Sequence, residues 1–323
     1  MRISEQMLRR MEYDLALNSA FRKGADLPVS NCWHFCTDGN AVDSMFFDNR
    51  DFIDGMNRLY LTSRRFLGMV ILAFVLMDTH LHIVTYGDYD VCNRFFHEYL
   101  RRTSMFISSR HGESKKLKGI RASCHKIDTD AYLKKAICYV IKNPTSAGLP
   151  YNPYDYPWSS GSLYFRSRDL WTSPAWSTDG QFTDILKNMG VNARRSYLKS
   201  KDIGSPEAAM SRGLIFPGEY VAVEIVERIF RTCRSFNFFL GNSREEDMDT
   251  LAARISRLSM PIQELRQHRD ELGRELFGGT GIRRLDMNQR LKLARTLRTR
   301  YSCSAKQVSK LCGLVYDEIR DGL

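Results

Sequence analysis

The chain has 323 residues, which is enough for about two domains that each bury a sizeable core. Its 48 lysines and arginines outnumber 37 aspartates and glutamates, and the formal net charge of +11 favours a polyanionic partner. No apolar run reaches the ~20 residues that a membrane-spanning helix needs, and residues 1–5 lack the basic-then-apolar order of a secretory signal. We therefore expect a cytoplasmic protein without a membrane span.

The first two thirds of the chain predict alternating strands and helices after a polar, basic N-terminal arm at residues 1–27. The expected elements are a strand, a helix, two strands, a helix, a strand and a helix, at residues 30–37, 48–61, 67–77, 80–84, 91–108, 120–127 and 130–143. Strand, helix, strand, strand, helix, strand is the order of a ferredoxin-like antiparallel sheet with helices on one face. The expected fold class is therefore α+β.

The last third of the chain predicts a separate, all-helical domain. Residues 202–206 predict a linker, so we expect one domain at 28–201 and a second at 207–323, with hardly any strand signal in the second. Its helices are expected at residues 219–233, 244–258, 288–300, 305–312 and 315–320. The short helix that opens at Ser304 and stops at Gly313 lies between two others, as in a helix-turn-helix. Plain helical bundles share this order, so DNA binding by this domain stays open.

Two short stretches carry the candidate chemistry. Side chains alternate along a strand, so His80 and His82 project from one face of the predicted sheet. Tyr139 and Asn143 are four residues apart on a helix that we expect Pro144 to end, and they share one helical face. If the helix packs beside the strand, the two imidazoles and the amide can ligate one divalent cation with the phenol next to it. This arrangement would place a nucleophile beside a Lewis acid.

These motifs resemble a known family, the single-tyrosine HUH transposases of the IS200 type, and especially their REP-associated tyrosine transposase relatives. His80-Leu81-His82 matches the histidine, hydrophobic, histidine motif that names the superfamily. Further matches in the same order as in the family lie at residues 33–35, 46–52, 139–148 and 155–160. The similarity covers roughly residues 28–200 and departs from the family pattern at Asp78-Thr79 and Thr145-Ser146.

The resemblance implies an enzyme that cuts and rejoins single-stranded or hairpin DNA. Tyr139 would attack a phosphodiester and form a 5′-phosphotyrosine, whose stored bond energy lets another 3′-hydroxyl reverse the step. His80, His82 and Asn143 would hold the cation that offsets the charge of the transition state. The candidates are Mg²⁺ and Mn²⁺, since imidazole ligands favour Mn²⁺ and availability in the cell favours Mg²⁺.

A basic loop, an aromatic residue and the tail are expected to contact the DNA. Basic side chains offer phosphate contacts, and aromatic rings offer faces on which unpaired bases stack. The expected DNA-binding residues are Lys115, Lys116, Lys118, Arg121, Tyr156, Lys306 and Arg320. The basic loop could equally be a solvated surface. We expect a monomer or a homodimer and no membrane partner.

Two alternatives limit this interpretation. A catalytically silent, domesticated transposase could keep the fold and act as a sequence- or hairpin-specific DNA-binding regulator. Cys32, His34 and Cys36 occupy every second position of a predicted strand, so their side chains share one face. Two thiols and an imidazole on one face suggest a zinc site. Three residues so close on one straight strand cannot surround a tetrahedral ion, so we expect reduced thiols there instead.

Overall fold

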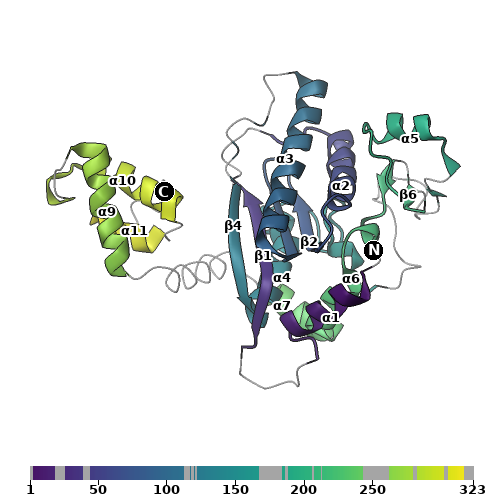
Figure 1. Ribbon diagram of the computed structural model, residues 1–323, viewed down its shortest axis with the longest axis horizontal. Coiled ribbons are helices and arrows are strands. Elements are labelled where there is room, and N and C mark those ends of the chain that lie inside the picture. Colours follow the sequence, from purple (N-terminus) through teal and green to yellow (C-terminus); the bar gives the residue numbers. More distant parts are fainter. Residues whose placement is uncertain are drawn as a thin grey trace. The chain divides into compact units, whose positions relative to one another are not determined.

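The computed structural model of the chain describes two compact units, Met1–Ser243 and Arg244–Leu323 (Figure 1). The described residues are 3–18, 26–38, 44–112, 117, 120, 122–166, 184–185, 188–205, 207–211, 213–242, 262–278, 282–301 and 305–315. Each unit has its own buried apolar core.

The first unit is built on a four-stranded antiparallel sheet with the strand order β2-β3-β1-β4. Its strands are β1, β2, β3 and β4, which span Pro28–Thr37, Met69–Leu76, Leu81–Gly87 and Ala122–Thr129. One helix connects β1 to β2 and another connects β3 to β4, which is the ferredoxin-like arrangement. The predicted α+β class is confirmed.

Helices cover both faces of this sheet, whereas the sequence predicted helices on one face only, so this part of the prediction is wrong. The two crossover helices, α2 and α3, and the helix after β4, α4, span Asn49–Ser63, Tyr89–His111 and Asp130–Ser146. Phe35 of β1 stacks on Phe96 of α3 with ring centroids 4.9 Å apart. The ring of the neighbouring His34 instead lies 6.0 Å from that of Tyr139 in α4. Because successive strand side chains point to opposite faces, α4 lies on the face opposite to α3.

The segment at residues 156–164 follows α4 and runs along the outer edge of β2. The N–H of Leu76 donates to the carbonyl oxygen of Trp158 at 2.9 Å, and the N–H of Ser160 donates to that of Phe74 at 3.0 Å. These bonds occupy backbone groups of an apolar edge strand that would otherwise be open to pairing with other chains.

Residues 207–242 also belong to the first unit, so the boundary between the units lies later than the linker expected at 202–206. The N–H of Ala222 donates to the carbonyl oxygen of Ile71 in β2 at 2.9 Å. Phe236 is completely buried. The boundary lies later than expected because residues 207–242 bond to the open edge of β2 and contribute side chains to the core of the first unit.

The same segment contains strands that the sequence did not predict. The remaining elements of the first unit are α1 (Glu5–Asp14), η2 (Gly161–Leu163), β5 (Asp184–Ile185), α5 (Val191–Tyr197), β6 (Ala209–Ser211), β7 (Leu214–Ile215), η5 (Pro217–Glu219), α6 (Val223–Phe230) and α7 (Cys233–Asn242). β5, β6 and β7 form a small sheet. The helix expected at 219–233 is shorter and spans only α6, because Arg231 adopts a left-handed φ of 66° that a right-handed helix cannot contain.

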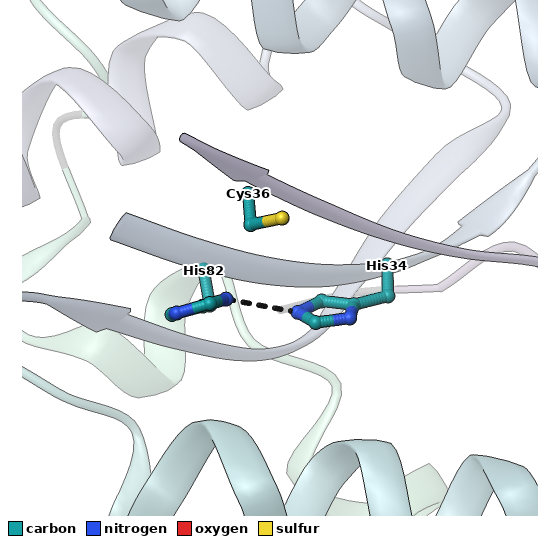
Figure 2. A group of neighbouring side chains, drawn as sticks. All are labelled: His34, Cys36 and His82. Atoms are coloured by element: carbon teal, nitrogen blue, oxygen red, sulfur yellow. Dashed lines mark hydrogen bonds between the residues drawn. The ribbon is translucent and has the colours of Figure 1, made fainter. Parts of the chain in front are cut away.

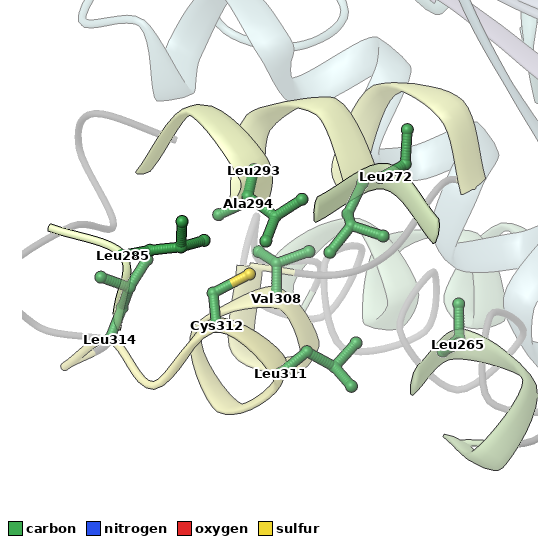
Figure 3. Packing of buried hydrophobic residues seen from close by; sticks show 10 residues of the cluster. Leu265, Leu272, Leu285, Leu293, Ala294, Val308, Leu311, Cys312 and Leu314 are labelled. Atoms are coloured by element: carbon green, nitrogen blue, oxygen red, sulfur yellow. The ribbon is translucent and has the colours of Figure 1, made fainter. Parts of the chain in front are cut away.

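The described part of the second unit is a small helical bundle. It contains α9 (Ile262–Phe277), η6 (Ile282–Arg284), α10 (Met287–Tyr301) and α11 (Ala305–Cys312). Buried side chains from these elements, including Leu272, Leu293 and Val308, form its core (Figure 3). Gly313, with φ 63°, ends α11 as expected. Ser304, the expected helix at 244–258, and the last expected helix after Val315 lie outside the described residues.

None of the described helices combines the length and the apolar character that crossing a membrane requires.

Candidate metal and nucleophile site

His80 and His82 lie at the start of β3, on the face that α4 covers. His82 is the second residue of the strand and is paired with Cys36 of β1. His80 precedes the strand, and its carbonyl oxygen accepts from the N–H of Met77 at 2.8 Å, which closes the β2–β3 hairpin. The Nδ1 of His80 lies 3.0 Å from the hydroxyl of Thr79. His82 is buried and His80 is partly buried.

Tyr139 and Asn143 are presented by α4. Pro144 was expected to end this helix, but α4 continues to Ser146. A proline so close to the end removes one backbone donor, and the N–H of Ala147 still donates to the carbonyl oxygen of Asn143 at 2.9 Å. Asn143 therefore stays on the helix, one turn after the tyrosine.

The structure brings the three predicted ligands and the predicted nucleophile together. The Nε2 of His80 lies 3.1 Å from the Oδ1 of Asn143, whose Nδ2 lies 3.3 Å from the Nε2 of His82. The ring of Tyr139 meets that of His82 edge-on, with centroids 5.3 Å apart and an interplanar angle of 85°. We call the Nε2 atoms of the two histidines and the Oδ1 of Asn143 the cation site.

A third histidine, His34, lies on the other side of the His82 ring. Its Nε2 is 3.1 Å from the Nδ1 of His82. Burial, with a smaller contribution from His125, lowers the pKa of His34 to about 3. Burial, followed by the neighbouring His34, His80 and His125, also lowers the pKa of His82 well below its usual value. Both rings are therefore neutral near pH 7, and neutral imidazoles can ligate a cation.

Outer partners can fix the proton positions that ligation requires. A neutral imidazole has one N–H and one lone pair. His82 offers the Nε2 lone pair to a cation when its proton is on Nδ1, from which it donates to the Nε2 of His34. His80 does so when its proton is on Nδ1, next to the hydroxyl oxygen of Thr79. Metal-ligating histidines almost always have such a partner.

The donor set of the cation site fits the expected metals. Two imidazole nitrogens and an amide oxygen are suitable ligands for Mn²⁺, and Mg²⁺ also accepts a site with few protein ligands because it keeps several waters. The sequence-based reasoning did not include His34 among the ligands or their partners. The motif at residues 33–35 was a signal for it, but only the pairing of β1 with β3 brings its ring to His82.

Cys36 joins His34 and His82 in a second group of donors. The ligand atoms of these three residues lie within 4.8 Å of one another, so the group could hold a metal ion (Figure 2). Burial raises the pKa of the Cys36 thiol to about 12. The sequence suggested Cys32, His34 and Cys36 as zinc ligands. In the structure the third donor beside His34 and Cys36 is His82 of the neighbouring strand, and not Cys32. We call His34, Cys36 and His82 the thiol site.

Most of the residues expected to contact DNA lie outside the described part of the chain. These are Lys115, Lys116, Lys118, Arg121 and Arg320, while Lys306 is described only as a backbone position of α11. Tyr156 is described, and the structure contradicts its expected stacking on bases. It is 4% exposed, and its hydroxyl donates to the carbonyl oxygen of Leu76 at 2.9 Å. Tyr156 is buried because it belongs to the segment that covers the edge of β2.

Among solved structures, the chain is similar to a REP-associated tyrosine transposase bound to a REP hairpin. The sequence identity is 18%, the similarity covers 44% of this chain and 82% of that chain, and the TM-score is 0.33. No protein-family model and no curated protein matches the chain. The name of this structure is that of the family that the motifs of this chain resemble.

Proposed function

We propose that this protein is a metal-dependent DNA strand transferase that cuts and rejoins single-stranded or hairpin DNA, with Tyr139 as the nucleophile. The observation that supports this function best is that the phenol ring of Tyr139 meets the ring of His82, while Asn143 lies between the Nε2 atoms of His80 and His82 on the same face of the sheet. These are the groups that metal-assisted attack on a phosphodiester requires.

Tyr139 supplies the attacking oxygen. The phenol loses its proton, its oxygen forms a bond to phosphorus, and the bond from phosphorus to the 3′ oxygen of the preceding nucleotide breaks. The products are a 5′-phosphotyrosine and a strand whose 3′ oxygen takes up a proton. Since the phosphotyrosine keeps the energy of the broken bond, the 3′-hydroxyl of another strand can reverse the step and join DNA without ATP.

His80, His82 and Asn143 would hold the Mg²⁺ or Mn²⁺ of this reaction. When bound, such a cation offsets the negative charge that grows on the phosphate oxygens and favours the phenolate. The protein contributes the positions of the reacting groups. Asn143 follows Tyr139 by one turn of the same helix, so the helix itself sets the distance between the nucleophile and the cation site.

DNA is the partner that the charge and the site favour. A formal net charge of +11 supplies sequence-independent attraction to phosphates. The proposed contacts are the lysines and the arginine of the loop at residues 115–121, the basic helix α10, Lys306 and Arg320. The protein would act as a monomer or a homodimer. Tyr156 is no longer among the proposed contacts, because its ring is buried.

The alternative, a catalytically silent DNA-binding regulator, does not explain the site. A protein that only binds DNA needs no tyrosine beside metal ligands. It also needs no buried histidine next to the Nδ1 of His82, where His34 lies. Loss of the reaction during domestication would be expected to leave these side chains free to change.

Capture of a covalent adduct tests the proposal. The full chain would be incubated with Mn²⁺ and a pool of single-stranded genomic fragments, and DNA that stays bound after denaturation would be sequenced. Tyr139→Phe should form no adduct while its DNA binding stays within a few-fold, because only the nucleophilic oxygen is lost.

Tyr132→Phe is the matched control on the same helix. The hydroxyl of Tyr132 is buried and has no hydrogen-bond partner among the described residues, so its removal should leave both the fold and the adduct intact. Adduct formation by Tyr139→Phe at the level of the unaltered chain would overturn the proposed function.

A further inference from the structure

We propose that the thiol site binds a thiophilic transition metal such as Zn²⁺, through His34 Nε2, Cys36 Sγ and His82 Nδ1. This site is distinct from the cation site, because it uses the other ring nitrogen of His82 and includes a sulfur ligand in place of the amide oxygen. One ligand atom from each of the three residues lies within 4.8 Å of the other two, and the Nε2 of His34 and the Nδ1 of His82 are 3.1 Å apart.

The pairing of β1 with β3 creates this ligand set. His34 and Cys36 are two residues apart on β1 and therefore share a face, and Cys36 is paired directly with His82. A single straight strand could not surround an ion, but ligands from two neighbouring strands can approach it from different directions. Figure 2 shows the three side chains gathered from these two strands.

The donors select the class of metal. Thiolate and imidazole are both ligands of tetrahedral zinc sites, and a site with three protein ligands leaves the fourth position for water. Mg²⁺ prefers oxygen ligands, so the sulfur discriminates against it. His34 and His82 are 2% and 7% exposed, and their nitrogens already face each other at 3.1 Å. A bound metal would replace the hydrogen bond between them.

The shared His82 makes the two sites mutually exclusive. A neutral imidazole has only one lone pair, so a metal on Nδ1 leaves the proton on Nε2. A protonated Nε2 has no lone pair left and cannot ligate a cation. A thiophilic metal should therefore displace Mn²⁺ from the cation site. This consequence, unlike the thiol site itself, rests on the proposed function.

Cobalt spectroscopy tests the thiol site without any DNA. Co²⁺ would be added to the full chain, prepared without a metal-binding tag. We expect a thiolate-to-cobalt charge-transfer band in the near ultraviolet and the visible absorption of tetrahedral cobalt, both saturating at one equivalent. Zn²⁺ should then abolish both. Cys36→Ser should lose the charge-transfer band and weaken binding by about tenfold or more, since even the loss of an outer partner has an effect of that size.

Cys124→Ser is the matched control. Cys124 is a partly buried cysteine on the neighbouring strand β4, outside the thiol site. The Cys124→Ser variant should keep the charge-transfer band. Cys36→Ala should lose the band, as Cys36→Ser does. Circular dichroism would show that each variant is folded. Absence of the band from the full chain, or its survival in folded Cys36→Ser, would overturn the proposed site.

Displacement of manganese tests the exclusivity. The electron paramagnetic resonance signal of free Mn²⁺ should rise when Zn²⁺ is added to the Mn²⁺-loaded full chain, and the concentration of Zn²⁺ required should increase about tenfold or more in Cys36→Ser. If the same concentration of Zn²⁺ released Mn²⁺ from the unaltered chain and from Cys36→Ser, the two sites would not be mutually exclusive. If the chain forms no DNA adduct, the proposed function fails, whereas the cobalt band still decides whether the thiol site exists.

Discussion

The Nε2 of His34 lies 3.1 Å from the Nδ1 of His82, while the opposite nitrogen of His82 lies 3.3 Å from Asn143. His82 is thus held between a strand and a helix by its two ring nitrogens. His34 and Asn143, the partners of these two nitrogens, therefore determine which ring nitrogen of His82 keeps its lone pair for a metal.

The first prediction concerns the positioning role of His34. His34→Leu removes the acceptor of the His82 Nδ1 proton, so the affinity of the full chain for Mn²⁺ should fall by about 10–100-fold, as expected for loss of an outer partner. His34→Gln supplies a side-chain oxygen and should retain more of the affinity. Titration of Mn²⁺ by calorimetry measures both. Equal affinities of His34→Leu and the unaltered chain would show that His34 only fills space.

The second prediction concerns Asn143 as a ligand. Asn143→Asp keeps an oxygen donor and adds a negative charge, so Mn²⁺ should bind more tightly and raise the melting temperature more than in the unaltered chain. Without metal, the same variant should be less stable, because it buries an uncompensated carboxylate at a position that is 7% exposed. Calorimetric melting with and without Mn²⁺ checks both effects. An increase in melting temperature no larger than that of the unaltered chain would argue against ligation by residue 143.

The third prediction concerns the pH dependence of stability in the metal-free protein. The pKa of His34 is about 3 in the folded chain and near ~6.5 in an unfolded one. The folded state therefore binds fewer protons within this window, and the free energy of unfolding contributed by His34 is lost as the pH falls through it. His34→Gln should reduce the slope by at most about 1.4 kcal/mol per pH unit between these limits. His82, whose pKa is also lowered and which contacts His34, stays in both proteins and acts in the same direction.

Urea unfolding at several pH values measures this slope. Asp54 has a pKa raised to about 6 by burial, against the opposing influence of Arg58, so it acts in the other direction at mildly acidic pH. It is present in both proteins, and its contribution therefore cancels in the difference. His97→Gln, at an exposed histidine of α3, is the matched control for replacing a histidine by glutamine. Parallel curves for His34→Gln and the unaltered chain would contradict a buried, neutral His34.

The fourth prediction separates the two units. Truncation after Asn242 should leave a folded protein that forms the Tyr139 adduct, because every proposed reacting group and the whole covering of β2 lie before this point. Truncation after Ser205 should give an unstable protein, since it removes the bond from Ala222 to β2 and the buried Phe236. Circular dichroism and adduct formation compare the two truncated proteins.

If the second unit binds duplex DNA, the chain truncated after Asn242 should show a shallower salt dependence. The slope of log affinity against log salt should decrease by ~0.9 for each duplex phosphate contact that is lost. Identical slopes for the truncated and full chains would mean that the second unit makes no phosphate contacts, and a role in dimerisation or in binding another protein would then be the better interpretation.

The sequence by itself determined the features that depend on local geometry. The period of two along a strand put His80 and His82 on one face, and the helical spacing put Asn143 one turn after Tyr139. The stop of α11 at Gly313 and the order of elements that gives the ferredoxin-like sheet also follow from neighbouring residues, because turns, caps and amphipathic periods are set within a few positions of the chain.

Only the tertiary structure decided which distant segments meet. Nothing in the local pattern shows that β1 pairs with β3 in the register that sets Cys36 opposite His82, and the thiol site depends on this pairing. The burial of Tyr156 and the position of the boundary after residue 243 were likewise missed. Both follow from the open edge of β2, whose unpaired backbone groups are satisfied by segments more than eighty residues away, and a local sequence period carries no information about such partners.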